Sequence, residues 1–415
     1  MKSAGILAAA VFLGLLAFGQ PGQQIQESSL VVNVEVPVRV FRGGEFVTDL
    51  SLDDFELFED GVPQKIEASY LVNKRAITRR EGEGNKFLPQ TSRNFYLFFE
   101  ISDYLPKIDE SLDYFVHGVI VPGDNIVVVT PVKTYRMTSE ALQAKSKEEI
   151  LRQFQGLLRR DTLSGSSEYR NVIEEMEMLA KSMSQAMAGQ SMIGTNVMQL
   201  DDYSSGAAEG RSIDELLQIY ANLLYNLEDI RWVDQRSLIQ FSEYLKNKEG
   251  QKYVYLFYQK EFIPRIDPRI LNQYMDLFQD RPDIQQTIAG LFDFYHRQIT
   301  FDVDEIKKAF ADSSISSHFL FISSPKKDII GVKQEESSDD IFNAFYQIAS
   351  SAGGFIDSSA NPAGLMRSAV EASENYYLLY YTPQSTARDG KFREIKVRVK
   401  DKKVRVVHRV GYFAR

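Results

Sequence analysis

Histidine and cysteine are the side chains that most often act as bases, nucleophiles or metal ligands near neutral pH, and this chain has few of them. There is no cysteine among its 415 residues, which excludes disulfide scaffolds, thiolate nucleophiles and iron–sulfur clusters. We expect the histidine that opens an apolar segment, His318, to be a core residue with its hydrogen bonds satisfied. The four histidines lie too far apart in the sequence to form a metal or catalytic motif: His117, His296, His318 and His408.

Carboxylate pairs are the remaining candidates for acid–base chemistry. Asp53-Asp54, Asp201-Asp202 and Asp339-Asp340 lie beside serines or in segments of loop character. The motifs of serine hydrolases, zinc proteases, phosphate-binding loops and dinucleotide-binding folds do not occur in the sequence. We therefore expect a protein that is not an enzyme. A hydrolase of the cell envelope that uses two carboxylates is the third alternative, because the distance between carboxylates in space cannot be read from sequence.

The composition is that of a globular protein. Hydrophobic residues make up 44% and charged residues 25%, which rules out a wholly disordered or fibrous chain. The length indicates two domains, or one large domain with additions. The 48 Lys and Arg against 57 Asp and Glu give a net charge of −9, so we expect no nucleic-acid partner.

The first residues are typical of a secretory signal peptide. Lys2 precedes an apolar run over 6–18, and small residues lead to a cleavage site near Gly19. The run is too short to cross a bilayer as a helix, although an uncleaved membrane anchor is the alternative. We expect a signal peptide over 1–19, no membrane span after its removal, and an exported protein that is periplasmic or extracellular.

Both ends of the remaining chain show strand patterns. Residues 28–72 alternate apolar and polar side chains, and 375–415 contain three strand-like segments separated by turns. The charged, glycine-containing residues 73–91 indicate a linker. Neither strand set is large enough to bury an apolar face alone, so we expect both to form one β-sandwich-like module.

The middle of the chain, residues 92–372, alternates apolar runs with helical patterns. The runs at 94–101, 124–132, 252–258 and 317–323 are typical of strands buried on both faces, which predicts a parallel α/β sheet. Two stretches are longer than a simple connection between parallel strands requires. We therefore expect helical insertions over about 140–250 and 261–300.

Several segments resemble a known family, the bacterial proteins related to the von Willebrand factor A domain, and in particular a secreted subgroup described from acidobacteria. The matching segments are DFELFEDGVPQKI (54–66), GDNIVVVT (123–130), the stretch from AFYQIASS to NYYLLYYTP (344–383), and FREIKVRVK with VRVVHRVGYF (392–400 and 404–413). The resemblance implies a doubly wound, mostly parallel sheet flanked by the terminal strands. It also implies a metal-ion-dependent adhesion site at the carboxyl ends of the strands.

The family's metal motif is altered in this sequence. The family has Asp-x-Ser-x-Ser after the first strand, where this chain has Glu100, Ser102 and Tyr104, and it has Ser-Asp where this chain has Tyr258-Gln259. If Mg²⁺ or Mn²⁺ binds, the resemblance assigns it to a degenerate site with these ligands: Glu100, Ser102, Asp103 and Thr162. Alternatively, Glu100 and Ser102 cap a helix that begins near Pro106.

The expected function follows from the resemblance and from the missing catalytic motifs. We expect an exported, non-catalytic, adhesion-type module that binds a protein partner in the cell envelope or the extracellular space without a cofactor. The alternative is the same binding role made dependent on Mg²⁺ or Mn²⁺.

Overall fold

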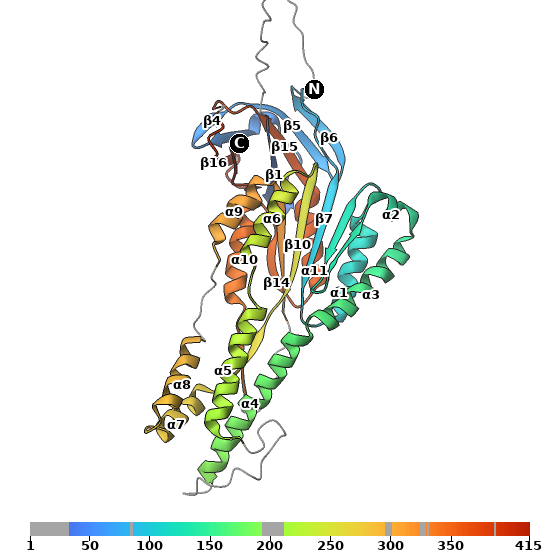
Figure 1. The fold of residues 1–415 in the computed structure, drawn as a ribbon. Coiled ribbons are helices and arrows are strands. Elements are labelled where there is room, and N and C mark those ends of the chain that lie inside the picture. Colours follow the sequence, from blue (N-terminus) through green and yellow to red (C-terminus); the bar gives the residue numbers. More distant parts are fainter. Residues whose placement is uncertain are drawn as a thin grey trace, which may run out of the picture. The chain divides into compact units, whose positions relative to one another are not determined.

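The middle of the chain is built around a mixed β-sheet that carries helices on both faces (Figure 1). The computed structural model describes residues 33–415 except 84–85, 193–210, 295–300, 324–328, 330–331 and 386. The predicted signal peptide, 1–19, lies outside the described residues.

The strands of this central sheet follow the order β14-β12-β10-β7-β8-β9. Neighbouring strands are parallel except β8 and β9, which are antiparallel. The strand that comes first in the sequence, β7, lies inside the sheet, so the strand order reverses direction between β7 and β10. The chain is therefore a mixed α/β protein with parallel strands in its central sheet, as the sequence predicted. The strands are β7 (Arg93–Glu100), β8 (Asn125–Val129), β9 (Thr134–Met137), β10 (Gln251–Gln259), β12 (Ile315–Ile322) and β14 (Ile356–Ser359).

Alternation along the strands explains why both faces are covered. Phe95 and Phe99 point to one face, where Phe99 stacks on Phe257 with ring centroids 4.6 Å apart, while Tyr96 and Phe98 point to the other. The helices over the first face are α1 (Pro106–Tyr114) with the turn η2 (Phe115–Val119), α2 (Ser139–Ala144), α3 (Lys147–Gly165) and α11 (Pro362–Glu374). Those over the second face are α6 (Gln235–Lys246), α9 (Val303–Asp312) and α10 (Asp339–Ser351).

A second group of helices has an apolar core of its own, formed by residues of α4, α5, α7, α8 and β11. The predicted helical insertions, about 140–250 and 261–300, are corrected in two respects. Helices α3 and α6 pack on the central sheet, because their apolar stripes match its two faces. The second insertion begins with a strand, β11, which buries Ile263 and Ile266 and pairs with β13. The elements are α4 (Ser167–Met192), α5 (Ile213–Ile230), β11 (Phe262–Ile266), α7 (Pro268–Leu277), α8 (Pro282–Phe294) and β13 (Val332–Glu336).

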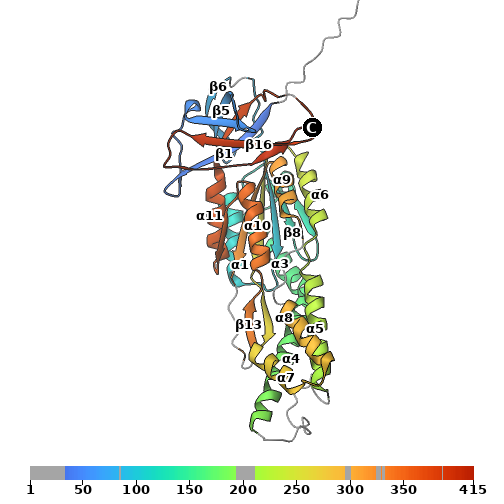
Figure 2. The same ribbon diagram turned by 90° about the vertical axis from the view of Figure 1, so that its left-hand side faces the viewer.

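The terminal strands form two further sheets that enclose a shared apolar core (Figure 2). In the first, β1 pairs with β15, and β15 pairs with β5, so strands from both ends of the chain alternate. In the second, β16 pairs with β3. The first sheet has the order β17-β1-β15-β5-β6 with β2 paired to β1: β1 (Val34–Arg42), β2 (Glu45–Phe46), β5 (Ile66–Asn73), β6 (Ala76–Gly82), β15 (Asn375–Tyr381) and β17 (Arg405–His408). The second has the order β18-β16-β3-β4, with the turn η1 (Leu52–Asp54) before it: β3 (Phe55–Glu59), β4 (Val62–Gln64), β16 (Phe392–Val399) and β18 (Gly411–Phe413).

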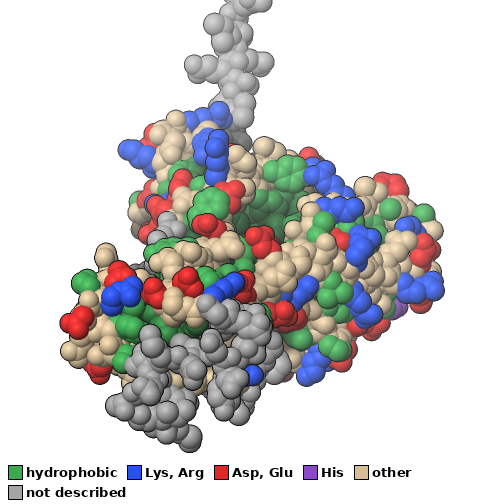
Figure 3. Space-filling view, turned by 60° about the horizontal axis from the view of Figure 1, so that its bottom comes forward, with side chains coloured by type: hydrophobic (Ala, Val, Ile, Leu, Met, Phe, Trp, Pro, Cys, Tyr) green, Lys and Arg blue, Asp and Glu red, His purple; other side chains and the backbone are tan. Residues whose placement is uncertain are grey.

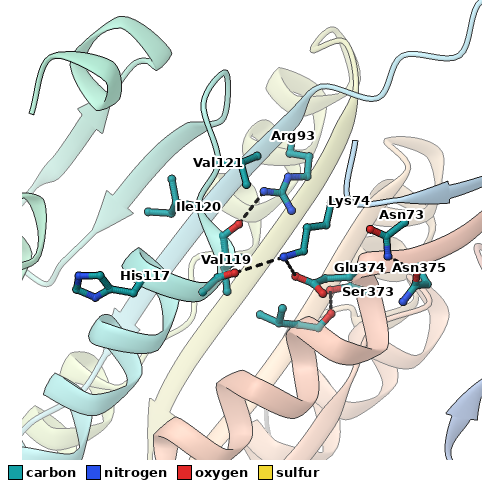
Figure 4. Close-up of polar contacts among 12 residues, drawn as sticks. Asn73, Lys74, Arg93, His117, Val119, Ile120, Val121, Ser373, Glu374 and Asn375 are labelled. Carbon is teal, nitrogen blue, oxygen red and sulfur yellow. Dashed lines mark hydrogen bonds and ion pairs between the residues drawn. The ribbon is translucent and has the colours of Figure 1, made fainter. Parts of the chain in front are cut away.

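The prediction of a linker over 73–91 is wrong for most of the first half of that range. Residues 76–82 form β6, which pairs antiparallel with β5 in a hairpin. The turn works because Lys74 adopts a left-handed conformation, with φ of 52°. The Lys74 ammonium lies 3.2 Å from Glu374 Oε1 and donates to Gly118 O, so the tip of the hairpin is attached to α11 and η2 (Figure 4).

A buried ion pair fixes the start of the central sheet. Arg93, the first residue of β7, donates from Nε to Asp124 Oδ1 over 3.0 Å and from Nη2 to Asp124 Oδ2 over 2.6 Å. Its Nη2 also donates to Val119 O over 2.8 Å (Figure 4). Both side chains are buried, so this bidentate pair ties β7 to the segment that leads into β8.

Candidate functional site

The carboxyl ends of β7 and β10 are the place where ligand-binding crevices form in open α/β sheets, because the strand order reverses between these two strands. Glu100 ends β7 and Gln259 ends β10. We call the loops and helix ends gathered here the rim: residues 100–103, 130–133, 161–170 and 258–261.

Gln259 connects the two strand ends directly. Its side-chain oxygen Oε1 accepts hydrogen bonds from the backbone nitrogens of Ser102 (3.0 Å) and Asp103 (2.9 Å). The Ser102 hydroxyl lies 3.3 Å from the same oxygen. Gln259 is buried, so this amide oxygen satisfies backbone donors that would otherwise be costly to bury.

The carbonyl oxygen of Ser102 also has hydrogen-bond partners within the protein. It accepts from Arg170 Nη1 over 3.1 Å and lies 2.6 Å from Ser166 Oγ. Arg170 additionally donates from Nη2 to Leu163 O over 2.6 Å. A guanidinium from the start of α4 therefore lies against Ser102, and its positive charge opposes the binding of a cation there.

Two carboxylates lie next to these contacts: Glu261 is partly buried, whereas Glu100, the last residue of β7, is exposed. Glu261 forms an ion pair with Arg231, which also donates to Ser337 O over 2.6 Å. Burial raises the pKa of Glu261, and the Arg231 guanidinium opposes that rise without cancelling it. Loss of water raises the pKa of Glu100 as well, and the charge of Glu261 adds to this. Within the described residues, the Glu100 carboxylate has no hydrogen-bond or ion-pair partner.

Asp161 and Thr162 do not lie in a loop, as the resemblance implied, but in the last turns of α3. Asp161 accepts from Thr130 Oγ1 (2.8 Å) and Tyr135 Oη (2.6 Å) and pairs with Arg160. Burial would raise the pKa of Asp161, but these three partners lower it on balance. Thr162 is fully buried, and its hydroxyl has no partner among the described residues. The buried face of α3 continues through this turn with Asp161 and Thr162 in place of apolar residues.

The residues present do not fit a divalent cation. Gln259 engages the amides of Ser102 and Asp103, and the Ser166 hydroxyl lies between the backbone oxygens of Ser102 and Thr162, so these groups already have partners within the protein. Tyr104, at the last position of the family's motif, donates its hydroxyl to Asp109 on α1. No group of three or more His, Asp or Glu that could hold a metal ion occurs in the described part of the chain.

The helix-capping alternative for Glu100 and Ser102 is wrong. Helix α1 does begin at Pro106, but its N-cap residue is Leu105, and no side chain caps it. Proline at the first helical position lacks the amide that a cap would satisfy.

Exposed apolar side chains flank the rim. Trp232, the only tryptophan, is 66% exposed and follows Arg231. Leu163 and Val132, which belong to the rim itself, are about half exposed. A Cβ at Gly165 would lie 2.5 Å from Pro131 Cβ, so the end of α3 packs directly on the 130–133 loop. Figure 3, in which the bottom of Figure 1 comes forward, shows apolar side chains in several patches among charged ones.

Sequence reasoning identified Gln259 as a missing metal ligand but did not predict its hydrogen bonds. It missed Arg170 and Arg231 entirely. Both arginines come from the helices α4 and α5 that leave the central sheet, and no local motif relates them to the rim.

No protein-family model matches the chain, and no curated protein matches it. Among solved structures, the chain is similar to the human COPII-coat protein Sec24c, with 6% sequence identity and a TM-score of 0.29. The similarity covers 84% of this chain and 46% of that protein, so the chain spans less than half of its length. A likeness this slight carries no functional argument. None of the helices in the described ranges is both long and apolar enough to cross a membrane.

Proposed function

We propose that this chain is an exported, non-catalytic protein-interaction module related to the von Willebrand factor A domain, whose rim binds a protein partner without a metal ion. The observation that carries this proposal is the contact of Gln259 Oε1 with the amides of Ser102 and Asp103. Where relatives would use a cation to connect the loops at the strand ends, this chain uses hydrogen bonds between its own residues.

The strand order supports a doubly wound architecture. The first strand lies inside the sheet, the order reverses beside it, and β9 is an antiparallel edge strand. Helices cover both faces. The pairing of β1 with β15 supports a joint module of terminal strands around the α/β domain.

The side chains around the rim support a protein partner. Exposed tryptophan is among the residues that contribute most to protein–protein binding, and Trp232 lies beside the Arg231–Glu261 pair. Leu163 and Val132 supply further apolar surface across the rim. This mixture of apolar anchors and charged neighbours suits an interface with a folded protein in the cell envelope or the extracellular space.

The test is capture of partners from an envelope extract by immobilised protein, with and without chelator. Three proteins are compared: the wild type, Trp232→Ala, and Tyr244→Ala, whose exposed ring lies near the end of α6 that leads back to the start of β10. The proposal expects a specific partner captured equally with and without chelator, lost in Trp232→Ala and kept in Tyr244→Ala. Loss of capture with chelator, or equal capture by all three proteins, would contradict it.

One second candidate is the same binding role made cation-dependent, for which the observation is the exposed Glu100 carboxylate, which has no hydrogen-bond or ion-pair partner among the described residues. Under this alternative, capture fails in chelator and returns when Mg²⁺ or Mn²⁺ is added back.

A further inference from the structure

A second polar site lies at the opposite end of the central sheet, where β10 and β12 begin and the first sheet of the terminal strands packs against them. We call it the cationic junction: Arg39, Lys252, His318, Tyr376 and Arg409. Arg39 on β1 donates from Nη1 to Gly353 O over 3.0 Å and from Nη2 to Ser316 Oγ over 2.8 Å. It is 2% exposed, and within the described residues no carboxylate forms an ion pair with it.

Four polar atoms in this junction have no hydrogen-bond partner among the described residues: Arg39 Nε, His318 Nε2, Tyr376 Oη and Arg409 Nε. The first three belong to side chains at most 2% exposed. His318 Nδ1 accepts a hydrogen bond from Phe355 N over 3.0 Å, and burial lowers the pKa of His318 well below its usual value. The ring is therefore neutral with its proton on Nε2, which makes that atom a buried donor.

The pairing of strands brings these groups together. Val38 lies opposite Tyr377 in the β1–β15 register, which places Arg39 opposite Tyr376. Arg39 also bonds Ser316, two residues before His318 and on the same side of β12. The Arg39 charge acts on both partners: after burial, it is the next influence on the pKa of His318, and it also opposes the rise in the pKa of Tyr376. Arg39, His318 and Tyr376 thus belong to one site.

The charge in the junction is unbalanced. Glu35 interacts electrostatically with Lys252, Arg409 and Tyr376, and Asp312 interacts with Arg409 as well. Arg409 donates to the backbone oxygen of Glu35 over 2.6 Å, and Lys252 donates to Ser313 O over 3.1 Å. Arg39 has no such counter-charge. A buried guanidinium without a counter-charge is strongly unfavourable, and the surplus here is positive.

We propose that the cationic junction binds a small monovalent inorganic anion of the chloride class, held by Arg39 Nε, His318 Nε2 and Tyr376 Oη. All three groups donate hydrogen bonds, and an anion accepts from all of them while balancing the Arg39 charge. A water molecule would satisfy the donors but would leave that charge unbalanced. The site is independent of the rim and of its proposed function.

The first experiment compares thermal unfolding in sodium chloride, sodium bromide and sodium gluconate at equal ionic strength and pH 7. An ion that binds only the folded chain raises the folding equilibrium constant by the factor 1 + [anion]/Kd. The site therefore predicts a higher melting temperature in chloride and bromide than in gluconate. It also predicts a bromide anomalous peak in contact with Arg39 Nε in crystals soaked in bromide.

Two variants localise the effect. Tyr376→Phe removes one donor with little change of volume and should weaken the chloride dependence, and Arg39→Met should abolish it. Tyr377→Phe is the matched control, because the Tyr377 hydroxyl bonds Val47 O on the other face of the same strand. If Arg39→Met does not fold, the chloride dependence of the melting temperature of Tyr376→Phe alone tests the proposal. Equal melting temperatures in chloride and gluconate, or a water without anomalous signal at the junction, would overturn the proposal.

Discussion

Gln259 Oε1 lies 2.9 Å from the backbone nitrogen of Asp103 and 3.0 Å from that of Ser102, so one buried amide oxygen fastens the end of β10 to the segment that follows β7. Both amide groups gain an acceptor inside the protein. The contact also fixes the orientation of the loop that carries the predicted site residues. The five expectations below follow from this and related contacts.

Replacing Gln259 by Leu should destabilise the fold by about 1–3 kcal/mol, because the volume is retained while the backbone donors of Ser102 and Asp103 lose their acceptor. Gln259→Glu keeps an oxygen at the same position and should be less destabilised than Gln259→Leu at pH 7. Urea unfolding of the three proteins measures the difference. Equal stability of Gln259→Leu and the wild type would show that the contact does not support the rim.

Trp232→Ala should leave the free energy of unfolding within about 0.5 kcal/mol of the wild type, because the side chain is mostly exposed. Its affinity for the captured partner should fall at least about tenfold. Since Trp232 is the only tryptophan, its fluorescence reports partner binding directly. An unchanged affinity would place the interface elsewhere.

Lys252 should make stability depend on pH. Burial and the charge of Arg409 together lower its pKa from 10.5 to about 8, against the opposing effect of Glu35. Between pH 8 and 10.5 the unfolded chain therefore holds more protons than the folded one, so stability rises with pH in this window. From pH 7.5 to 9.5 the gain is about 2 kcal/mol. Lys252→Met should lose this gain in denaturant unfolding at the two pH values; the same gain in both proteins would contradict the assignment.

Asp124→Asn should be strongly destabilising, by about 3–5 kcal/mol, because it leaves the Arg93 guanidinium buried without a counter-charge. The double variant Arg93→Met with Asp124→Leu removes both charges and should recover much of this loss. Denaturant unfolding of the single and double variants tests the expectation. A double variant no more stable than the single one would indicate that packing, rather than charge, dominates at this position.

The apolar runs were the most informative part of the sequence for the central sheet. Segments such as 94–101 and 252–258 became β7 and β10 because a strand buried on both faces needs apolar side chains throughout. The strand patterns at the two ends of the chain likewise correspond to strands that pair with each other.

Other features depend on contacts between distant residues, which a sequence pattern does not contain. Residues 76–82 looked like a linker because they are charged, yet they form an edge strand whose turn is held by Lys74 and Glu374. Within the predicted insertion over about 140–250, α5 ends at Ile230 and α6 begins after Asp234, which caps it.

The residues of the candidate site lie at the end of β7, directly after it, or in α3, but their contacts were not predictable from the motif alone. Thr162 was assigned to a loop and lies in α3. His318 was expected to have its hydrogen bonds satisfied, but only Nδ1 has a partner within the described residues. Arg170 reaches the rim from a helix of the insertion, at a distance in sequence that no motif covers.

Isothermal titration of the wild type and of Ser102→Ala with Mg²⁺ and Mn²⁺ tests the central claim most directly, because the claim is that hydrogen bonds of Gln259 and Arg170, and no cation, hold the rim together. The account predicts heats no larger than dilution for both proteins and both ions. A saturable heat near one ion per chain in the wild type, lost in Ser102→Ala, would contradict it.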